Sequence, residues 1–337
     1  MSTSVTTPTP QGRRMVAVAI LVSSLVALAL WAFAWPAART APRDLPLGVA
    51  GPAAATAPLK DQLREKKGAF EVHQYADEAA ARDAIEDRAV YGAVVVTPRG
   101  MKLLTATAAG PVVAQLLEQA VAGQAPQGAD VTTADVVAAP ANDPRGSALG
   151  ASILPMAIAG VAAGAIVRML GLRGIRAVAS LVLAAALVGV VAAAVTHSWL
   201  GILTGNWWAE AGVLSLLTLA VGGTVAGCAA LLGPAGIGVG ALTMVLLGNP
   251  FSGVTSAPQL LPEPVGFVGQ LLPPGAGGTL LRSVSFFDGA GSTGPLVTLG
   301  AWALLGLTAV LLGALRRRPA AAAHAEAPAV REAAPVA

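Results

Sequence analysis

The sequence predicts a polytopic α-helical membrane protein with six transmembrane helices and a small extracytoplasmic α/β domain between the first and second helices. Of its 337 residues, 55% are hydrophobic and only 12% are charged, which is about half the charged fraction of a typical soluble protein. Apolar runs recur along the chain, and most approach the roughly 20 residues that a helix needs to cross a bilayer. A more polar stretch, residues 36–148, separates the first run from the others.

The first apolar run, residues 15–35, follows Arg13 and Arg14 and so resembles a signal peptide. It is, however, longer than the apolar core of a typical signal peptide, which has about 7–15 residues. We therefore expect an uncleaved membrane anchor, preceded by a cytoplasmic N-terminus of residues 1–14.

Five more runs follow the polar stretch and form the predicted membrane domain, residues 149–316. The fifth span of the chain is short and emerges from the turn GPAG, so we expect spans four and five to form a helical hairpin. The five predicted spans of this domain are residues 149–167, 177–195, 211–232, 236–247 and 295–315.

Basic residues gather at alternate ends of these spans, as the positive-inside rule expects of cytoplasmic segments. The loop between spans three and four carries neither Lys nor Arg. This asymmetry predicts a multi-pass protein of the cytoplasmic membrane with both termini inside and residues 36–148 outside. The tail, residues 317–337, is low in complexity, and we expect it to be disordered. The arginines on the predicted inner side are Arg13, Arg14, Arg168, Arg173, Arg176, Arg316, Arg317 and Arg318.

The outer stretch alternates patterns typical of strands and helices. DLPLGVAG and AFEVHQY are predicted strands, and APLKDQLREKKG is a short amphipathic helix. ADEAAARDAIEDRA consists of good helix formers with acids in its first turn, which the helix dipole favours. A hairpin is predicted for VYGAVVVTP and MKLLTATA. A helix is predicted for GPVVAQLLEQAVAG, and a last strand for ADVTTADVVA. These elements predict a small α/β domain on an open sheet, followed by a linker.

The sequence carries no motif for catalysis or cofactor binding. It lacks a phosphate-binding G-x-x-x-x-G-K-[ST] loop, an H-E-x-x-H zinc motif and a G-x-S-x-G nucleophile turn. Cys228 is the single cysteine, and His73 has no second metal ligand at a suitable spacing. We therefore predict that the protein is not an enzyme and has no catalytic residue, metal or cofactor. Its net charge of +3 is not itself an indication of a nucleic-acid partner.

Ionisable residues are scarce inside the five later spans, which argues against the charged relay of a proton-coupled transporter. For Glu210, at the start of span four, we favour a helix-cap role over a role in a pathway. Two G-x-x-x-G pairs, Gly160 with Gly164 and Gly223 with Gly227, predict close helix packing in lipid, within the chain or between copies.

The segment 249–291 is too apolar for an ordinary loop, and its six prolines break any long helix. Irregular backbone at membrane depth is tolerated only where protein buries it or a wet cavity lies beside it. We therefore expect a re-entrant pair of short helices near residues 265–272 and 277–287, broken at Pro273–Pro274, with Arg282 at the outer rim. An interfacial amphipathic loop with a snorkelling Arg282 is the alternative.

Two sequence patterns accompany this order of elements. The pattern in the outer domain consists of Ala79, Ala84, Tyr91, Val94, Val95, Val96 and Pro98. The pattern in the segment 249–291 consists of Asn249, Pro250, Gly253, Leu261, Pro262, Leu272, Pro273, Pro274, Gly275, Arg282, Phe287 and Gly289. Together they resemble the ABC-2-type membrane proteins and, among them, the YhgE/Pip-like (phage infection protein) and DUF3533-like branch. The longer members of this family have a helical insertion in the outer domain, so the chain resembles the short form.

The resemblance implies a permease-like subunit that exports an unknown, amphipathic or hydrophobic substrate. It also implies a separate ATPase as the source of energy, and a second membrane half, often another copy of the chain, as a partner in the lipid. The alternative is a non-transporting scaffold or surface receptor whose outer domain binds a partner.

Overall fold

The computed structural model describes residues 11–66, 68–97, 100–123 and 131–315. The predicted disordered tail, most of the N-terminal segment, Pro98 and residues 124–130 of the linker lie outside these ranges. The described part is mostly helical and contains five helices long and apolar enough to cross a membrane. They are α1 (Gln11–Ala37), α5 (Ser147–Met169), α6 (Gly174–Ala193), α7 (Trp207–Leu232) and α11 (Thr293–Leu315).

Helix α7 forms the centre of the bundle, because α5, α6 and α11 all pack against it. Its apolar residues point in every direction, which is typical of a helix buried on all sides. The main apolar core joins Leu214 and Leu217 of α7 to Ile153 of α5 and Leu299 of α11. The bundle is therefore built around one central helix.

The fifth predicted span is shorter than a full crossing. Helix α8 (Ala235–Ala241) continues as a π-helix, Leu242–Leu247, so the apolar helix Ala235–Leu247 is only about 20 Å long at 1.5 Å per residue. It turns back along α7, as the predicted hairpin requires. A Cβ on Gly236 would lie 2.1 Å from the carbonyl oxygen of Cys228, so glycine permits this tight return.

The α/β domain is a five-stranded mixed sheet in the order β2-β1-β3-β4-β5. Strand β1 pairs in parallel with β2 and β3, β3 and β4 form the predicted antiparallel hairpin, and β4 pairs in parallel with β5. One apolar core contains residues of α3, and another contains residues of α2 and α4. The elements are β1 (Leu45–Ala50), α2 (Ala53–Glu65), β2 (Phe70–Tyr75), α3 (Glu78–Glu86), β3 (Gly92–Thr97), β4 (Gly100–Thr105), α4 (Pro111–Ala122) and β5 (Val131–Asp135).

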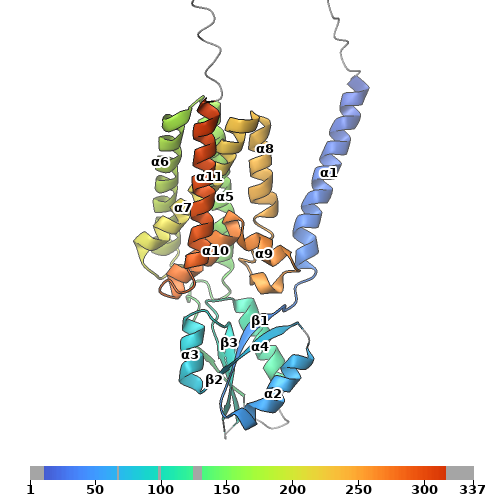
Figure 1. The fold of residues 1–337 in the computed structure, drawn as a ribbon, viewed down its shortest axis with the longest axis vertical. Coiled ribbons are helices and arrows are strands. Elements are labelled where there is room, and N and C mark those ends of the chain that lie inside the picture. Colours follow the sequence, from blue (N-terminus) through green and yellow to red (C-terminus); the bar gives the residue numbers. More distant parts are fainter. Residues whose placement is uncertain (1–10, 67, 98–99, 124–130, 316–337) are drawn as a thin grey trace, which may run out of the picture.

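The α/β domain lies at one end of the bundle, and the start of α1 and the end of α11 lie at the other (Figure 1). The chain enters the domain from α1 and leaves it into α5, so the domain sits between the first two long helices.

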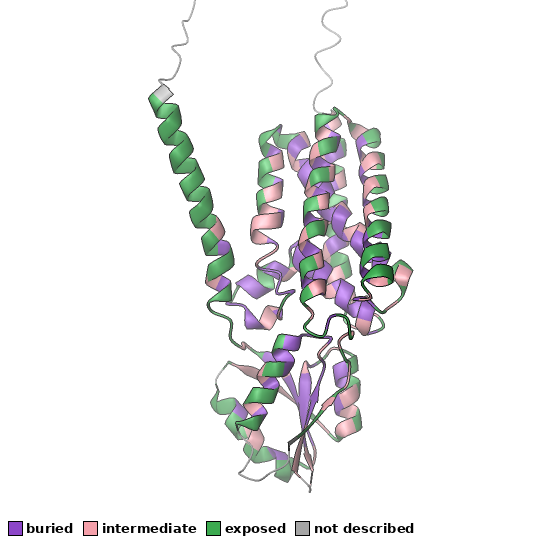
Figure 2. Cartoon of the chain, turned by 180° about the vertical axis from the view of Figure 1, so that it is seen from behind, coloured by how far each residue is buried: buried purple, intermediate pink, exposed green. Residues whose placement is uncertain are grey.

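Helix α1 stands apart from the bundle along most of its length, where its side chains are exposed (Figure 2). It is fixed at its lower end, where Ala32 is buried in a small cluster with Phe251, Leu261 and Val265. Trp31 also packs edge-on against Phe251, with ring centroids 6.1 Å apart. The exposed apolar side chains of α1 must therefore contact lipid or another protein.

The segment 249–291, which we call the broken segment, lies between the bundle and the α/β domain (Figure 1). It contains a 3₁₀ turn (Pro258–Leu260) and two short helices, α9 (Val265–Gln270) and α10 (Pro273–Phe286). The predicted break is present, but the second helix begins at Pro273 itself and not at residue 277. Proline fits the first turn of a helix because the amide hydrogens there have no partner within the helix.

Candidate functional site

A cavity of about 250 Å³ lies where the α/β domain meets the broken segment. We call it the junction cavity. Pro46, Ile85 and Val90 contribute apolar surface from the α/β domain. Its polar lining comes from both sides of the junction and consists of Arg88, Tyr91, Gln259, Gln270, Thr279 and Arg282.

Arg282 is buried in this cavity, so the prediction that it faces the rim is wrong. Its side chain is only 5% exposed, and Nη2 donates a hydrogen bond of 2.9 Å to the carbonyl oxygen of Val254. The buried Nε has no hydrogen-bond partner among the described residues. Gly278 explains the close approach, because a Cβ there would lie 2.3 Å from Cγ2 of Val254.

Arg88 reaches the same cavity from the end of α3. Its backbone adopts the left-handed conformation (φ 60°) just after the C-cap Asp87. The amides of Arg88 and Ala89 donate back to the carbonyls of Ile85 and Ala84, which is the Schellman pattern. Glycine is the usual residue at this position, so an arginine here carries a conformational cost.

The guanidinium of Arg88 ties the α/β domain to α10. Nη1 donates to the carbonyl oxygen of Thr279 at 3.1 Å and to the hydroxyl of Ser283. The guanidinium also lies over the ring of Phe287, 5.2 Å from its centroid. Sequence reasoning missed Arg88, because its partners are nearly 200 residues away in the chain and no local pattern announces them.

The cavity is electrostatically one-sided. None of the described residues that line it is an aspartate or a glutamate. Burial lowers the pKa of Arg88. Burial and then the nearby positive charge of Arg88 lower the pKa of Arg282 to about 10. Because arginine stays protonated in proteins at neutral pH, the cavity holds two positive charges, and the partners of both among the described residues are neutral groups.

The other polar groups are engaged with one another. The Tyr91 hydroxyl donates to Oε1 of Gln259 at 2.8 Å, and burial raises the pKa of Tyr91. Gln270 donates through Nε2 to the carbonyl oxygen of Ser252 at 2.8 Å and accepts from the Thr279 hydroxyl at 2.7 Å. These bonds hold α9, α10 and the chain before them in one arrangement around the arginines.

A second, more apolar pocket of about 420 Å³ adjoins the first, sharing Pro258, Gln259 and Gln270 with it. Leu261 and Phe267 line this pocket, together with Arg43 and Asp44 just before β1 and Glu263 just before α9. We call it the α9 pocket. Phe267 is 71% exposed, so α9 presents an apolar surface to its surroundings.

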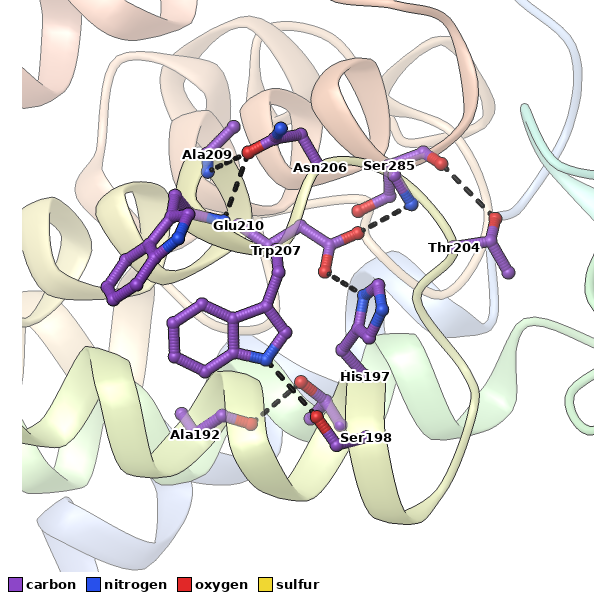
Figure 3. A network of polar contacts seen from close by, with 12 residues as sticks. Ala192, His197, Ser198, Thr204, Asn206, Trp207, Ala209, Glu210 and Ser285 are labelled. Atoms are coloured by element: carbon purple, nitrogen blue, oxygen red, sulfur yellow. Dashed lines mark hydrogen bonds and ion pairs between the residues drawn. The ribbon is translucent and has the colours of Figure 1, made fainter.

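A separate polar cluster lies at the start of α7 (Figure 3). Glu210 is fully buried, and its carboxylate contacts Nδ1 of His197 at 2.7 Å and accepts from the amide of Gly205 at 2.9 Å. The predicted cap role of Glu210 is wrong, because Asn206 caps α7 by accepting from the amides of Trp208 and Ala209. Glu210 instead joins the loop before α7 to the π-helix Ala194–Trp199 that continues α6.

The glycine pairs lie in contacts within the chain. A Cβ on Gly160 would lie 2.7 Å from Cβ of Val221, and one on Gly164 2.6 Å from the carbonyl oxygen of Gly222, so both face α7. Gly227 faces α11 with similar closeness, whereas Gly223 would leave a Cβ 3.6 Å from its nearest neighbours.

The remaining predicted residues of the broken segment shape it and do not line the junction cavity. Gly253 has a φ of +65°, Pro273 and Pro274 open α10, and a Cβ on Gly275 would lie 2.1 Å from the carbonyl oxygen of Gly269. Phe287 is buried under Arg88. Asn249 and Pro250 are half-buried and Pro262 is buried, and none of the three lines a described pocket.

No family model, curated protein or solved structure matches the chain. The resemblance to the ABC-2-type membrane proteins therefore stays a prediction from the sequence patterns.

Proposed function

We propose that the chain is a permease-like subunit of an ABC-2-type export system in the cytoplasmic membrane. A separate ATPase drives it in this proposal, and the substrate is an amphipathic or hydrophobic molecule moved outward. The observation that carries the proposal is the junction cavity, which lies between the broken segment and the α/β domain and is lined by two arginines. Ligand sites are commonly found at such domain boundaries, where a few polar groups converge in a concave surface.

The arrangement of charge supports an outer position for the α/β domain. Arg168 in the last turn of α5 and Arg173 before α6 lie at the end of the bundle that is opposite the α/β domain. Arg13 and Arg14 begin α1 at the same end. The positive-inside rule assigns that end to the cytoplasm. The proposal includes six passes, with Ala235–Leu247 as a short fifth one returning along α7.

The exposed flank of α1 supports a second membrane half beside this one. A window of α1 long enough to span the bilayer is only 6% buried within the chain, compared with 72% for α7. Another copy of the chain is the simplest partner in the ABC-2 reading. Lipid alone is the other possible cover, and cross-linking from α1 in native membranes distinguishes the two.

Co-purification tests the permease proposal directly. The tagged full chain is extracted from its native membrane in a mild detergent, and the proteins that accompany it are identified by mass spectrometry. We expect a nucleotide-binding subunit in comparable amount and ATP hydrolysis that follows the tagged chain through size-exclusion chromatography. The proposal would fail if the chain were recovered alone and without ATP hydrolysis in every detergent that preserves its fold.

A scaffold or receptor is the second candidate, and the α/β domain at one end of the bundle supports it. The sheet has apolar cores on both faces that include α2, α3 and α4, and strands β2 and β5 are its edges. Deletion of residues 40–145 should then abolish partner binding, whereas Arg282→Ala in the full chain should leave it unchanged.

A further inference from the structure

Among the residues that the structure describes, no aspartate or glutamate forms an ion pair with either arginine of the junction cavity. Arg282 donates to a carbonyl, and Arg88 donates to a carbonyl and a hydroxyl. Neutral acceptors satisfy hydrogen-bond donors but do not cancel a charge, and a buried unpaired charge is unfavourable. The residues that line the cavity supply no carboxylate within the described chain.

The buried Nε of Arg282 is a donor without an acceptor. Buried polar groups in proteins are nearly always hydrogen-bonded, so an exception calls for an explanation such as a ligand. Arginine presents its donors in a planar fork that matches the oxygens of a phosphate or carboxylate. An anionic group between Arg88 and Arg282 would supply both the missing charge and the missing acceptor.

The surroundings of the cavity indicate what such an anion carries. About 250 Å³ accommodates a head group and little more. The α9 pocket continues from Gln259 and Gln270 toward Leu261 and the exposed ring of Phe267. Leu271, at the end of α9, is also half exposed. A polar chamber that opens beside an apolar helix face fits a molecule with a charged head and an apolar tail.

We propose that the junction cavity binds the anionic head group of an amphiphile between Arg88 and Arg282, with the apolar tail in the α9 pocket and along α9. This inference rests on the proposed function in one respect, because it names the chemical class of the molecule moved. The binding itself requires neither an ATPase nor transport, so it is measured independently of both.

Calorimetric titration of the purified full chain, in a phosphate-free solution of a neutral detergent, tests the proposal. The probes are dioctanoyl phosphatidic acid, dioctanoyl phosphatidylcholine and inorganic phosphate. We expect saturable binding of the phosphatidic acid, much weaker binding of the zwitterionic lipid, and weaker binding of phosphate than of the phosphatidic acid. Equal binding of phosphate and phosphatidic acid would overturn the amphiphile and leave a site for free anions.

Variants show whether the arginines are responsible. Arg282→Gln keeps a donor but removes the charge, and we expect the affinity for phosphatidic acid to fall about tenfold or more, the scale of one charge-assisted hydrogen bond. Arg282→Lys should retain more affinity than Arg282→Gln. Arg64→Gln is the matched control, because Arg64 is an exposed arginine of α2 that pairs with Asp61, away from the junction cavity. Equal affinity in Arg282→Gln and the native chain would overturn the proposal.

A second variant separates lost binding from lost folding. Arg88→Gly places the preferred residue at the left-handed position after α3, so the end of that helix is retained while the charge disappears. We expect weakened binding of phosphatidic acid and an unchanged elution volume in size-exclusion chromatography. Native affinity in this variant, with Arg282 intact, would show that Arg88 takes no part in the site. Loss of binding in both variants alongside a recovered ATPase would support both proposals, whereas arginine-dependent binding without any ATPase would sustain only this one.

Discussion

Gly275 offers the sharpest test of how the broken segment holds together. It lies in the first turn of α10, and a Cβ there would come within 2.1 Å of the carbonyl oxygen of Gly269 on α9. Real Cβ contacts essentially never fall below 3.0 Å, and the nearest atom is backbone, so Gly275→Ala must push the two helices apart by roughly 1 Å. Overpacking of this kind costs about 1–3 kcal/mol.

The cost should appear as a lower apparent melting temperature. A loss of 1 kcal/mol shifts the melting temperature of a domain of 150–250 residues by about 2–4 °C, so we expect Gly275→Ala to melt about 2–12 °C lower. Cys228, the only cysteine in the sequence, is half-buried on α7 and serves as the reporter. A maleimide dye that fluoresces on reaction with its thiol follows unfolding at a fixed heating rate, because thermal unfolding of such proteins is usually irreversible.

Gly300→Ala is the matched control for this measurement. Gly300 lies inside α11, where nothing would stand within 4 Å of an added Cβ. Alanine is the better helix former by about 1 kcal/mol, so this variant should melt at or above the native temperature. If Gly275→Ala also melted at or above the native temperature, the tight packing of α9 on α10 would be refuted.

Three further predictions use the same assay. Gly227→Ala should melt at a lower temperature, because its Cβ would lie 2.7 Å from the carbonyl oxygen of Gly306. Gly223→Ala should leave the melting temperature unchanged, because no neighbour would lie nearer than 3.6 Å to its Cβ. Equal shifts would refute the conclusion that Gly227 packs more closely against α11 than Gly223 does. Asn206→Ala should cost about 1 kcal/mol through the lost cap of α7, and Asn206→Asp should recover most of it. Glu210→Ala should cost about 1 kcal/mol by removing the partner of the half-buried His197 ring and Gly205 amide, and Glu210→Gln should cost less. Identical melting of the two Glu210 variants would contradict the pairing.

Local sequence patterns were sufficient to predict the long helices, one hairpin and the break in the segment 249–291. The apolar runs of about 20 residues became α1, α5, α6, α7 and α11, because length and hydropathy together specify such helices. The hairpin β3–β4 and the break at Pro273–Pro274 also followed from local chemistry, since turn residues and proline act on their immediate neighbours. The start of α10 was placed four residues late, because the proline pair was read only as a break and not as a first turn.

Local patterns gave the wrong environment for two charged residues, because tertiary contacts determine where both side chains lie. A lone arginine in an apolar segment reads locally as a snorkelling side chain, but the α/β domain covers α10 and buries Arg282. Glu210 reads locally as a first-turn acid, and only the fold brings His197 to its carboxylate. The candidate site was therefore predicted in half, with Arg282 named and Arg88 missed.

Arg88 also explains why the junction holds one geometry. Its left-handed backbone is costly for any residue with a Cβ, by roughly 1–2 kcal/mol, so the position persists only because the surroundings favour it. Those surroundings are the Schellman hydrogen bonds at the end of α3 and, for the side chain, the carbonyl of Thr279, the hydroxyl of Ser283 and the ring of Phe287. The three side-chain contacts lie at α10 or just beyond it. Since the side-chain contacts join an αL residue of the α/β domain to α10, a shift of α10 against the bundle must either carry the end of α3 with it or break these contacts. The same guanidinium lines the cavity, so any such shift would also change the spacing of the two positive charges.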